Sequence, residues 1–501
     1  MEKKKIIIIG GGIAGLSAGC YARMNGFEAV IYERHTAPGG LCTAWKRKGY
    51  TIDGCIHWLV GTKPGGTFRK YWDELGALDG VSVFDDDSVN ILEVEAAGMK
   101  RSFTVYSDAD RLNAHMKELS PEDAATIDEF TGLIKRFAEF DMDFGKPREL
   151  MGLRDFIAMM RKLGPYMGDF SRYSRLSIGD FAERFSSPVL REGIRDSFND
   201  PRMALMALVF MLAWKHVGNA GFPRGGSLEF SRRIERRFVS LGGTIHYGRG
   251  VSRILVERGR AVGIELDDGT VDRADIVISC ADGYTTIYRM LGGKYRNRKI
   301  DRQYAELPLF EPLFSLALGI RRDFSKEPHM AVRTLERPMT IEGRTHAKIG
   351  FMNYSFDPSL APSGCSLLEL MYTSDYDRWK RLSSDRAAYE AEKDAVAKEL
   401  IAGLEQVYPG IGKDIEMMDT VTPVTWERYT GNRRGTFEAW LITKDTINLS
   451  MKKTLPGLRN FYMAGHWVQP GGGVPSAMRS GRDLIEIICA GERKAFVTTR
   501  P

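Results

Sequence analysis

The chain of 501 residues is long enough for more than one domain, and its 43% hydrophobic and 27% charged residues are ordinary globular proportions. The net charge of +6 argues against a nucleic-acid partner and gives only weak attraction to an anionic membrane. The six cysteines form no CxxC pair and the eight histidines are dispersed, so we expect reduced thiols, a cytoplasmic protein and no metal site.

A strand that ends in glycine comes first, in the stretch KKKIIIIGGGIAGLSAGCYA. Its four consecutive isoleucines predict a strand buried on both faces in a parallel sheet. Gly10, Gly12 and Gly15 follow with GxGxxG spacing, before small and apolar residues typical of a closely packed helix. The first glycine allows the tight turn, the second lets a pyrophosphate approach the backbone, and the third lets helix meet strand. The helix start would hold the phosphates.

A second apolar segment, EAVIYE, ends at Glu33, 23 residues after Gly10. At this spacing a carboxylate can bind a ribose 2′-hydroxyl, and its charge disfavours the 2′-phosphate of NADP. The two elements therefore predict a dinucleotide site, which up to this point suits NAD or FAD equally.

The residues after Glu33 favour FAD. They read RHTAPGGLCTAWKRKGYTIDGCIHWLVG, with a Gly39-Gly40 pair and then Asp53-Gly54, where a plain NAD-binding fold would continue with another crossover helix. This stretch resembles the flavin amine oxidase and phytoene desaturase superfamily, and TIDGCIHWLVG resembles its branch of carotenoid isomerases and retinol saturases. The resemblance implies that the Gly-Gly turn passes the pyrophosphate and ribityl chain of FAD.

The resemblance returns twice along the chain. Residues 221–282 look like the return to the flavin domain, with Val251 near the adenine and Ala281 near the phosphates, and residues 458–491 supply a last strand, a turn at Gly465 and a helix. The resemblance and the glycine motif together imply these cofactor-binding residues: Gly10, Gly12, Ile13, Ala14, Gly15, Glu33, Arg34, Gly39, Gly40, Leu41, His57, Val251, Ala281, Gly465, His466, Gly473 and Val474.

The last helix has a chemical role in this interpretation. Pro475 lies near its start and Gly491 is a natural stop. Its positive end would face the pyrimidine edge of the flavin and stabilise the anionic reduced ring. The superfamily usually has an acidic residue after the glycine that matches Gly465, whereas this chain has His466, which leaves the role of His466 open between ribityl and substrate contact.

The expected fold is α/β, with a discontinuous Rossmann-like FAD-binding domain of the glutathione-reductase type and a large α+β substrate domain. Residues 1–100, 221–290 and 455–501 would form the first domain, and residues 101–220 and 291–454 the second. An amphipathic helix is expected at residues 384–407. The apolar stretches are too short for a signal peptide or a membrane span. Methionine and aromatic stripes in the insertions fit a packed core and a lipid tunnel equally.

The chemistry is assigned to the flavin, because no nucleophile elbow or metal motif is apparent. His57, Trp58 and His466 are the catalytic candidates. His57 would exchange a proton near neutral pH or only bond a backbone carbonyl. Tyr429, Thr430 and Trp440 are further candidates to line the site. The resemblance implies an enzyme that saturates, desaturates or isomerises double bonds of a polyene or isoprenoid-like lipid by hydride transfer at flavin N5.

The sequence has no second strand-GxGxxG-helix unit, so a separate electron donor or acceptor is expected. A lipid-soluble substrate would favour peripheral contact with a membrane. Two alternatives stay open: an amine or amino-acid oxidase, for which Lys444 could be placed near N5 although nothing in the sequence singles it out, and a non-catalytic isoprenoid carrier of the same fold. The complete glycine set and Glu33 argue against a carrier, and Gly39-Gly40 argues against an NAD-dependent dehydrogenase.

Overall fold

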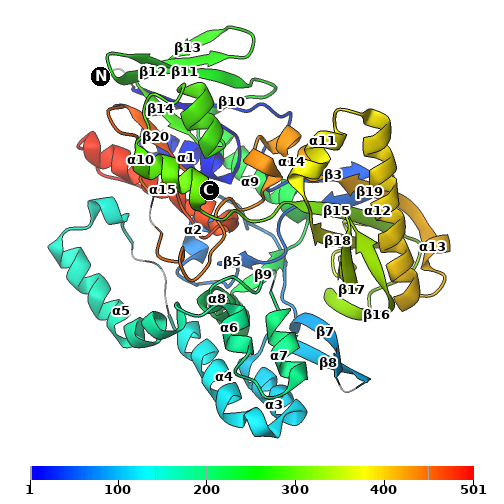
Figure 1. Ribbon diagram of the computed structural model, residues 1–501. Helices are drawn as coiled ribbons and strands as arrows, with labels where there is room; N and C mark the ends of the chain where they lie inside the picture. The colour runs from blue at the N-terminus through cyan, green and yellow to red at the C-terminus, as the bar shows by residue number, and fades with distance from the viewer. Residues whose placement is uncertain (1–2, 97, 141–142, 144, 199, 450) are drawn as a thin grey trace.

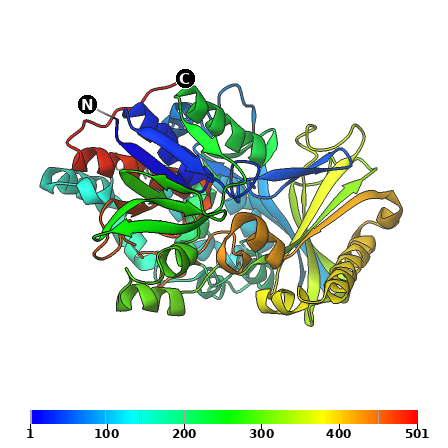
Figure 2. The ribbon, with the colours of Figure 1, turned by 90° about the horizontal axis from the view of Figure 1, so that it is seen from above.

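The isoleucine run forms the central strand of a five-stranded parallel sheet in this computed structural model, which describes residues 3–501 except 97, 141–142, 144, 199 and 450. Across the sheet, the strands are β10 (Thr244–His246), β2 (Glu28–Tyr32), β1 (Lys5–Ile9), β14 (Ile276–Ser279) and β20 (Phe461–Met463). Parallel pairing brings together strands that lie far apart in the sequence. Viewed from above, most of the blue, green and red segments lie on one side of the molecule, and a blue hairpin extends from them to the yellow segments on the other side (Figure 2).

Both faces of this sheet are covered, which explains the unbroken apolar run. Ile6 and Ile8 face a core that includes the helices α1 (Ile13–Met24), α9 (Gly226–Ser240) and α15 (Gly473–Gly491). Ile7 and Ile9 face the opposite way, toward a three-stranded antiparallel sheet. That sheet consists of β11 (Val251–Glu257), β12 (Arg260–Leu266) and β13 (Val271–Arg273). The Rossmann-like α/β architecture predicted from the sequence is confirmed.

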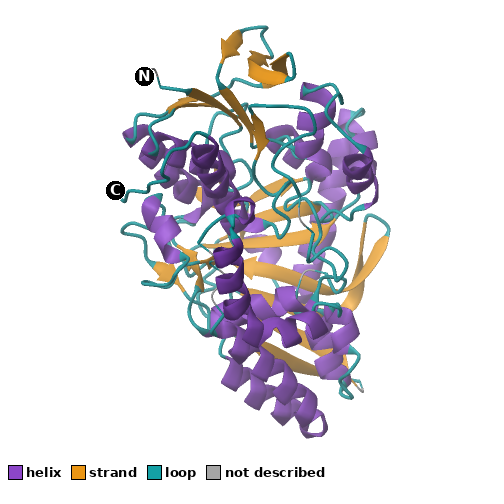
Figure 3. Ribbon diagram, turned by 90° about the vertical axis from the view of Figure 1, so that its left-hand side faces the viewer, coloured by secondary structure: helices purple, strands orange, loops and turns teal. Residues whose placement is uncertain are grey.

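A seven-stranded sheet forms the core of the second half of the molecule (Figure 1). Across it the strands are β19 (Ile415–Val421), β15 (Leu313–Ile320), β18 (Ser366–Thr373), β17 (Arg344–Asn353), β16 (Met330–Ile341), β7 (Ser88–Ala96) and β8 (Met99–Tyr106). Helix α12 (Arg386–Val407) packs on β16 and β17 through Leu400 and Leu404, close to the range expected from the sequence. In the side view the three-stranded sheet lies at the top and the strands of the large sheet cross the middle (Figure 3).

The expected domain boundary at residue 100 falls inside β8. Strand β7 hydrogen bonds to β16 in parallel, through the pairs of Ala331 with Ile91 and Val332 with Leu92. Strands β7 and β8 therefore belong to the seven-stranded sheet, and the sheet topology moves this boundary to before Ser88. The other divisions of the chain stay predictions.

Helices from the first insertion build a third hydrophobic core below the sheets. They are α3 (Ala109–Leu119), α4 (Ala124–Ala138), α5 (Leu153–Tyr173), α6 (Ile178–Ala182), α7 (Pro188–Arg195) and α8 (Leu205–His216). The remaining elements are β3 (Ala44–Arg47), β4 (Tyr50–Asp53), β5 (Leu59–Val60), α2 (Arg69–Glu74), β6 (Val83–Phe84), β9 (Ala220–Pro223), α10 (Arg298–Glu306), α11 (Tyr376–Leu382), α13 (Ile411–Asp414), α14 (Pro423–Thr430) and the short turns Pro121–Asp123, Arg148–Leu150, Thr285–Met290 and Arg433–Gly435.

Candidate active site

A cavity of about 2190 Å³ joins the two halves of the molecule. Small-molecule sites usually have volumes of roughly 300–1,000 Å³, so this cavity has room for more than one ligand. It is lined by most residues predicted to bind the cofactor: Gly10, Gly12, Ile13, Ala14, Glu33, Arg34, Gly39, Gly40, Leu41, His57, Val251, Ala281, Gly465, His466, Gly473 and Val474. Gly15 does not line it, because Gly15 lies where α1 packs against the turn that precedes it.

Two glycine turns lie against each other at one end of the cavity. Gly10 has a φ of +99° and donates its N–H to the carbonyl oxygen of Tyr32 at 2.8 Å. The N–H of Gly39 donates to the carbonyl oxygen of Gly11 at 2.9 Å and joins the second turn to the first. A Cβ on Gly12 would meet nothing closer than the carbonyl oxygen of Gly39, at 3.7 Å. The turns therefore present bare backbone to the cavity.

Two helices begin at this cavity without a side-chain cap. Helix α1 begins at Ile13 and α15 at Gly473, and neither has an acidic residue in its first turn. The first N–H groups of a helix have no partner within the helix and attract negative charge. The start of α1 therefore suits a pyrophosphate, and the start of α15 suits a ring that becomes anionic when reduced.

Glu33 follows β2 and is only 6% exposed. Its Oε2 accepts the N–H of Gly11 at 2.6 Å, and its Oε1 accepts the N–H of His35 at 2.7 Å. An ionised carboxylate offers about four acceptor positions, so both oxygens keep capacity for the hydroxyls of a ribose. These two backbone bonds fix the carboxylate beside the first glycine turn, where the sequence predicts the ribose.

Burial keeps the two candidate histidines neutral. Desolvation lowers the pKa of His57 to about 4, with a smaller contribution from His329, and desolvation lowers the pKa of His466 to about 4. The expected titration of His57 near neutral pH is therefore wrong, because the buried imidazolium would lose its hydration without gaining an anionic partner. Neutral His57 still forms a hydrogen bond, since its Nδ1 lies 3.3 Å from the hydroxyl of Tyr354.

The other candidate residues lie at different depths in the wall of the cavity. Tyr429 and Thr430 line the cavity, as does Trp58, which packs against Trp214 with ring centroids 6.2 Å apart. Trp440 is buried behind the lining, and its indole N–H donates to the carbonyl oxygen of Trp467 at 3.2 Å. Trp440 therefore supports the wall and does not line the cavity.

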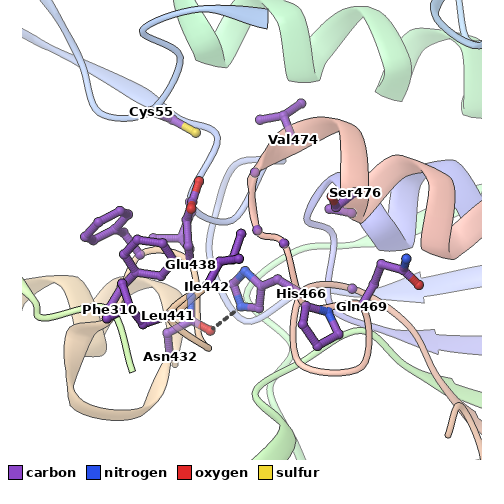
Figure 4. A pocket seen from close by; sticks show the side chains of 18 of the residues that line it. Cys55, Phe310, Asn432, Glu438, Leu441, Ile442, His466, Gln469, Val474 and Ser476 are labelled. Carbon is purple, nitrogen blue, oxygen red and sulfur yellow. Dashed lines mark hydrogen bonds between the residues drawn. The ribbon is translucent and has the colours of Figure 1, made fainter. Parts of the chain in front are cut away.

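Asn432 connects the wall to the C-terminal turn. Its Oδ1 lies 3.3 Å from Nε2 of His466 and accepts the indole N–H of Trp467 at 3.1 Å (Figure 4). His466 is therefore held against the segment after α14, on the side of the cavity where α15 begins. Nothing in the sequence pattern pointed to Asn432.

The part of the cavity below the glycine turns is lined mainly by apolar side chains. They come from α4 and the segment directly after it, from α5 and from α8, and include Phe137, Phe140, Met159, Leu163, Tyr166, Phe170, Phe210, Met211 and Trp214. Other residues of α8, such as Leu208 and Leu212, are buried in the helical core. The methionine and aromatic stripes thus serve both purposes that the sequence left open, a packed core on one side and a cavity wall on the other.

Two acidic residues that the sequence analysis missed also line the cavity. Glu369, on β18, is 2% exposed, accepts the hydroxyl of Tyr354 at 3.3 Å, and has a pKa raised well above its usual value by burial. Glu438 precedes the buried Trp440, and burial raises the pKa of its carboxyl to about 7. Glu369 is the single charged residue of the apolar run LLELM, and Glu438 that of FEAWL. A lone carboxyl group in an apolar run is the sequence feature that could have indicated both residues.

Comparison with known protein families assigns the chain to one family. A family model described as Flavin containing amine oxidoreductase matches residues 13–483. The chain belongs to this family. FAD is its cofactor, and the protein is an FAD-dependent oxidoreductase. The bare glycine turns, the uncapped helix starts and the carboxylate of Glu33 fit the pyrophosphate, the ring and the ribose of FAD, which supplies hydride transfer at N5 when bound.

Individual relatives share nearly the whole chain. Prolycopene isomerase from Daucus carota is 25% identical over 511 aligned positions, which cover 97% of this chain and 79% of the relative. Phytoene desaturase (neurosporene-forming) from Cereibacter sphaeroides is 24% identical over 510 positions, with 97% and 95% covered. A solved putrescine oxidase variant superposes with a TM-score of 0.63 at 13% identity, with 98% and 99% covered, and shows the same fold. The predicted resemblance to carotenoid isomerases and phytoene desaturases is confirmed.

Proposed function

We propose that this oxidoreductase saturates, desaturates or isomerises carbon–carbon double bonds of a long polyene or isoprenoid-like lipid. The observation that carries the proposal is the large cavity of about 2190 Å³, whose lining includes both the glycine turns and the Phe and Met side chains around α4, α5 and α8. A polyene has no charged group to anchor it, so it needs a long apolar enclosure to leave water. The names of the two carotenoid relatives support the same chemistry.

The proposed roles of the lining residues follow from their positions. The glycine turns and the start of α1 bind the pyrophosphate, and Glu33 binds the ribose. Neutral His57, held by Tyr354, and Trp58 border the ring and orient the substrate, and His466 borders the ring from the side of α15. Electrons enter or leave through a separate donor or acceptor.

The function is tested with purified holoenzyme and a panel of phytoene, poly-cis-lycopene and retinol, under reducing and under oxidising conditions. We expect at least one polyene to change its number or geometry of double bonds, measured by chromatography with absorbance spectra. Amines should release no hydrogen peroxide. Peroxide from an amine, together with unchanged polyenes under both conditions, would overturn the proposal.

The amine oxidase alternative would use a lysine near flavin N5, and Lys444 is the lysine considered for that role. Its ammonium forms an ion pair with Asp180 at 3.0 Å, and the two side chains are 45% and 43% exposed. Lys444 is among the residues that line the cavity, but its ammonium is engaged by Asp180 and is partly exposed to solvent, so we do not assign it the role of a lysine beside the flavin.

We also propose that α5 contacts an anionic membrane. Among the described residues, every helix is too short or too polar to span a bilayer. Helix α5 nevertheless exposes Leu153, Phe156, Ile157, Met160 and Met167, by 37% to 76%, at the margin of the molecule (Figure 1). The same helix carries four basic and two acidic residues. Apolar side chains flanked by basic ones are typical of helices that lie in the membrane interface.

Membrane contact is tested by flotation with vesicles of phosphatidylcholine and phosphatidylglycerol. We expect L153S/I157S, which changes two exposed residues outside the cavity lining, to reduce the bound fraction at least fivefold. The matched control V239S/V271S removes apolar side chains exposed by 53% and 49% on other elements and should bind like the parent. Equal flotation of both variants would contradict the assignment of α5.

A further inference from the structure

Glu438 is a carboxyl group in the cavity without a partner. Among the described residues, no hydrogen bond or ion pair involves its side chain, although its neighbours Phe437, Ala439 and Trp440 lie in a well-bonded segment. The residue is partly buried and its exposed part faces the cavity. A carboxyl group placed inside a protein normally has a hydrogen-bond partner, because removing it from water alone is costly. An exception of this kind, facing a ligand cavity, calls for a functional explanation.

The backbone holds Glu438 in place on both sides. The N–H of Phe310 donates to the carbonyl oxygen of Ala439 at 2.9 Å, and the hydroxyl of Thr436 donates to the carbonyl oxygen of Phe310 at 2.9 Å. Ala439 has a φ of +57°, a left-handed conformation that non-glycine residues rarely adopt. This turn buries Ala439 and Trp440 while Glu438 faces the cavity. Backbone strain of this type is characteristic of functional sites.

The carboxyl group lies against the start of α15. Its Oε2 is only 2.4 Å from the position that a Cβ on Gly472 would occupy, and its Oε1 is 3.5 Å from that of Gly473. The carboxyl does not cap the helix, however. Figure 4 shows Glu438 pointing toward Cys55, with Phe310, Leu441 and Ile442 beside it. The group therefore lies between the expected position of the ring and the apolar part of the cavity.

No charged neighbour stabilises an ionised Glu438. The titratable groups on the surrounding segments are the thiol of Cys55 and the imidazoles of His57 and His466. The interaction with Cys42, together with burial, raises the pKa of Cys55, and burial lowers the pKa of both imidazoles, so that all three groups are uncharged. Desolvation accordingly raises the pKa of Glu438 to about 7, so that its acid and carboxylate forms both exist near neutral pH. A general acid or base works best under this condition.

We propose that Glu438 is the catalytic residue that exchanges a proton with the double bond of the substrate. In an isomerisation, its O–H bond breaks while a C–H bond forms at one carbon of the double bond, and the resulting cation is delocalised over the polyene. Rotation about the former double bond and return of either hydrogen of that carbon, as a proton, to the carboxylate complete the step without redox change, so that solvent hydrogen can remain on the carbon. In a saturation the proton remains on the substrate, and hydride from reduced FAD supplies the second hydrogen and the electron pair.

This inference rests on the proposed function, and its test separates the two. In wild-type holoenzyme we expect deuterium from D₂O to appear in the product or in recovered substrate, and the rate to fall as pH rises through about 7, since the acid form is required. E438Q should lower the rate at least a hundredfold and abolish deuterium incorporation. Its remaining rate should no longer fall as pH rises through about 7. E438D, which keeps a carboxyl group, should retain part of the rate and part of the deuterium incorporation. E257Q, at an exposed and ion-paired position outside the cavity lining, should behave like the parent.

A spectroscopic measurement checks the protonation itself. The difference between the infrared spectra of the parent and of E438Q should contain the carbonyl band of a protonated carboxylic acid at pH 6 and should lose it near pH 8. Glu369, whose pKa burial also raises, contributes equally to both proteins and cancels. Retained flavin absorbance and an unchanged melting temperature would show that E438Q is folded. An active wild type, together with an E438Q that keeps its rate and its deuterium incorporation, would overturn the role of Glu438 alone. A wild type inactive on every polyene would overturn the proposed function instead.

Discussion

Replacement of Gly15 by alanine is expected to abolish FAD binding and to lower the free energy of unfolding by about 3 kcal/mol. A Cβ on Gly15 would lie 2.0 Å from the carbonyl oxygen of Gly10, so α1 would have to move away from the turn. Movement of α1 would also disturb α15, because Gly481 packs so closely that its own Cβ would lie 2.4 Å from the carbonyl oxygen of Ala14. Denaturant unfolding of the apoprotein and flavin absorbance measure the two effects.

Gly12→Val provides the contrast. The nearest protein atom to a Cβ at Gly12 is 3.7 Å away, so the apoprotein should melt within a few degrees of the parent. The valine side chain would instead fill the space where the pyrophosphate is expected, and FAD should no longer bind. A Gly12→Val protein that keeps its flavin would show that the pyrophosphate lies elsewhere, and a fully stable Gly15→Ala protein would contradict the packing argument.

Replacement of Glu33 by alanine is expected to weaken FAD binding at least a hundredfold. The change removes the acceptor of two short backbone hydrogen bonds, from Gly11 and His35, and it removes the predicted acceptor for the ribose. Each bond to a charged group contributes roughly 1.5–3 kcal/mol, so loss of the ribose bonds alone accounts for about this factor. Titration of apoprotein with FAD, followed by quenching of flavin fluorescence, gives the dissociation constant.

The control for Glu33 lies on the same strand. Glu28 is exposed at the start of β2, and its side chain is remote from the cavity lining. Glu28→Ala should leave the affinity for FAD unchanged. If Glu33→Ala bound FAD as tightly as Glu28→Ala, the ribose would have another partner.

The cofactor half of the site was predictable because its signals are local. Gly10, Gly12, Gly15 and Glu33 occupy a short stretch, and each position is set by strand and helix geometry that the sequence pattern encodes. The isoleucine run similarly predicted a strand covered on both faces, which the opposite packing of Ile6 and Ile7 confirms.

The catalytic half was less predictable, because it depends on contacts between distant segments. Burial of His57 comes from elements that include the wall at Tyr354, 297 positions later, and this burial lowers the pKa that the sequence suggested would be near neutral. Glu438 belongs to a loop whose orientation depends on the left-handed Ala439 and on a bond from Phe310. The spacing of residues along the sequence predicts neither the desolvation of His57 nor the position of Glu438.

The pairing in the parallel sheet determines when the FAD-binding domain can fold during synthesis on the ribosome. Strand β1 emerges first, but its neighbour β14 pairs with β20, and α1 packs against α15, near the end of the described chain. Contacts this distant in sequence are slow to form and leave apolar surface exposed meanwhile. We therefore expect nascent chains that lack residues 461–491 to stay flavin-free and dependent on chaperones, with cofactor capture among the last events of folding.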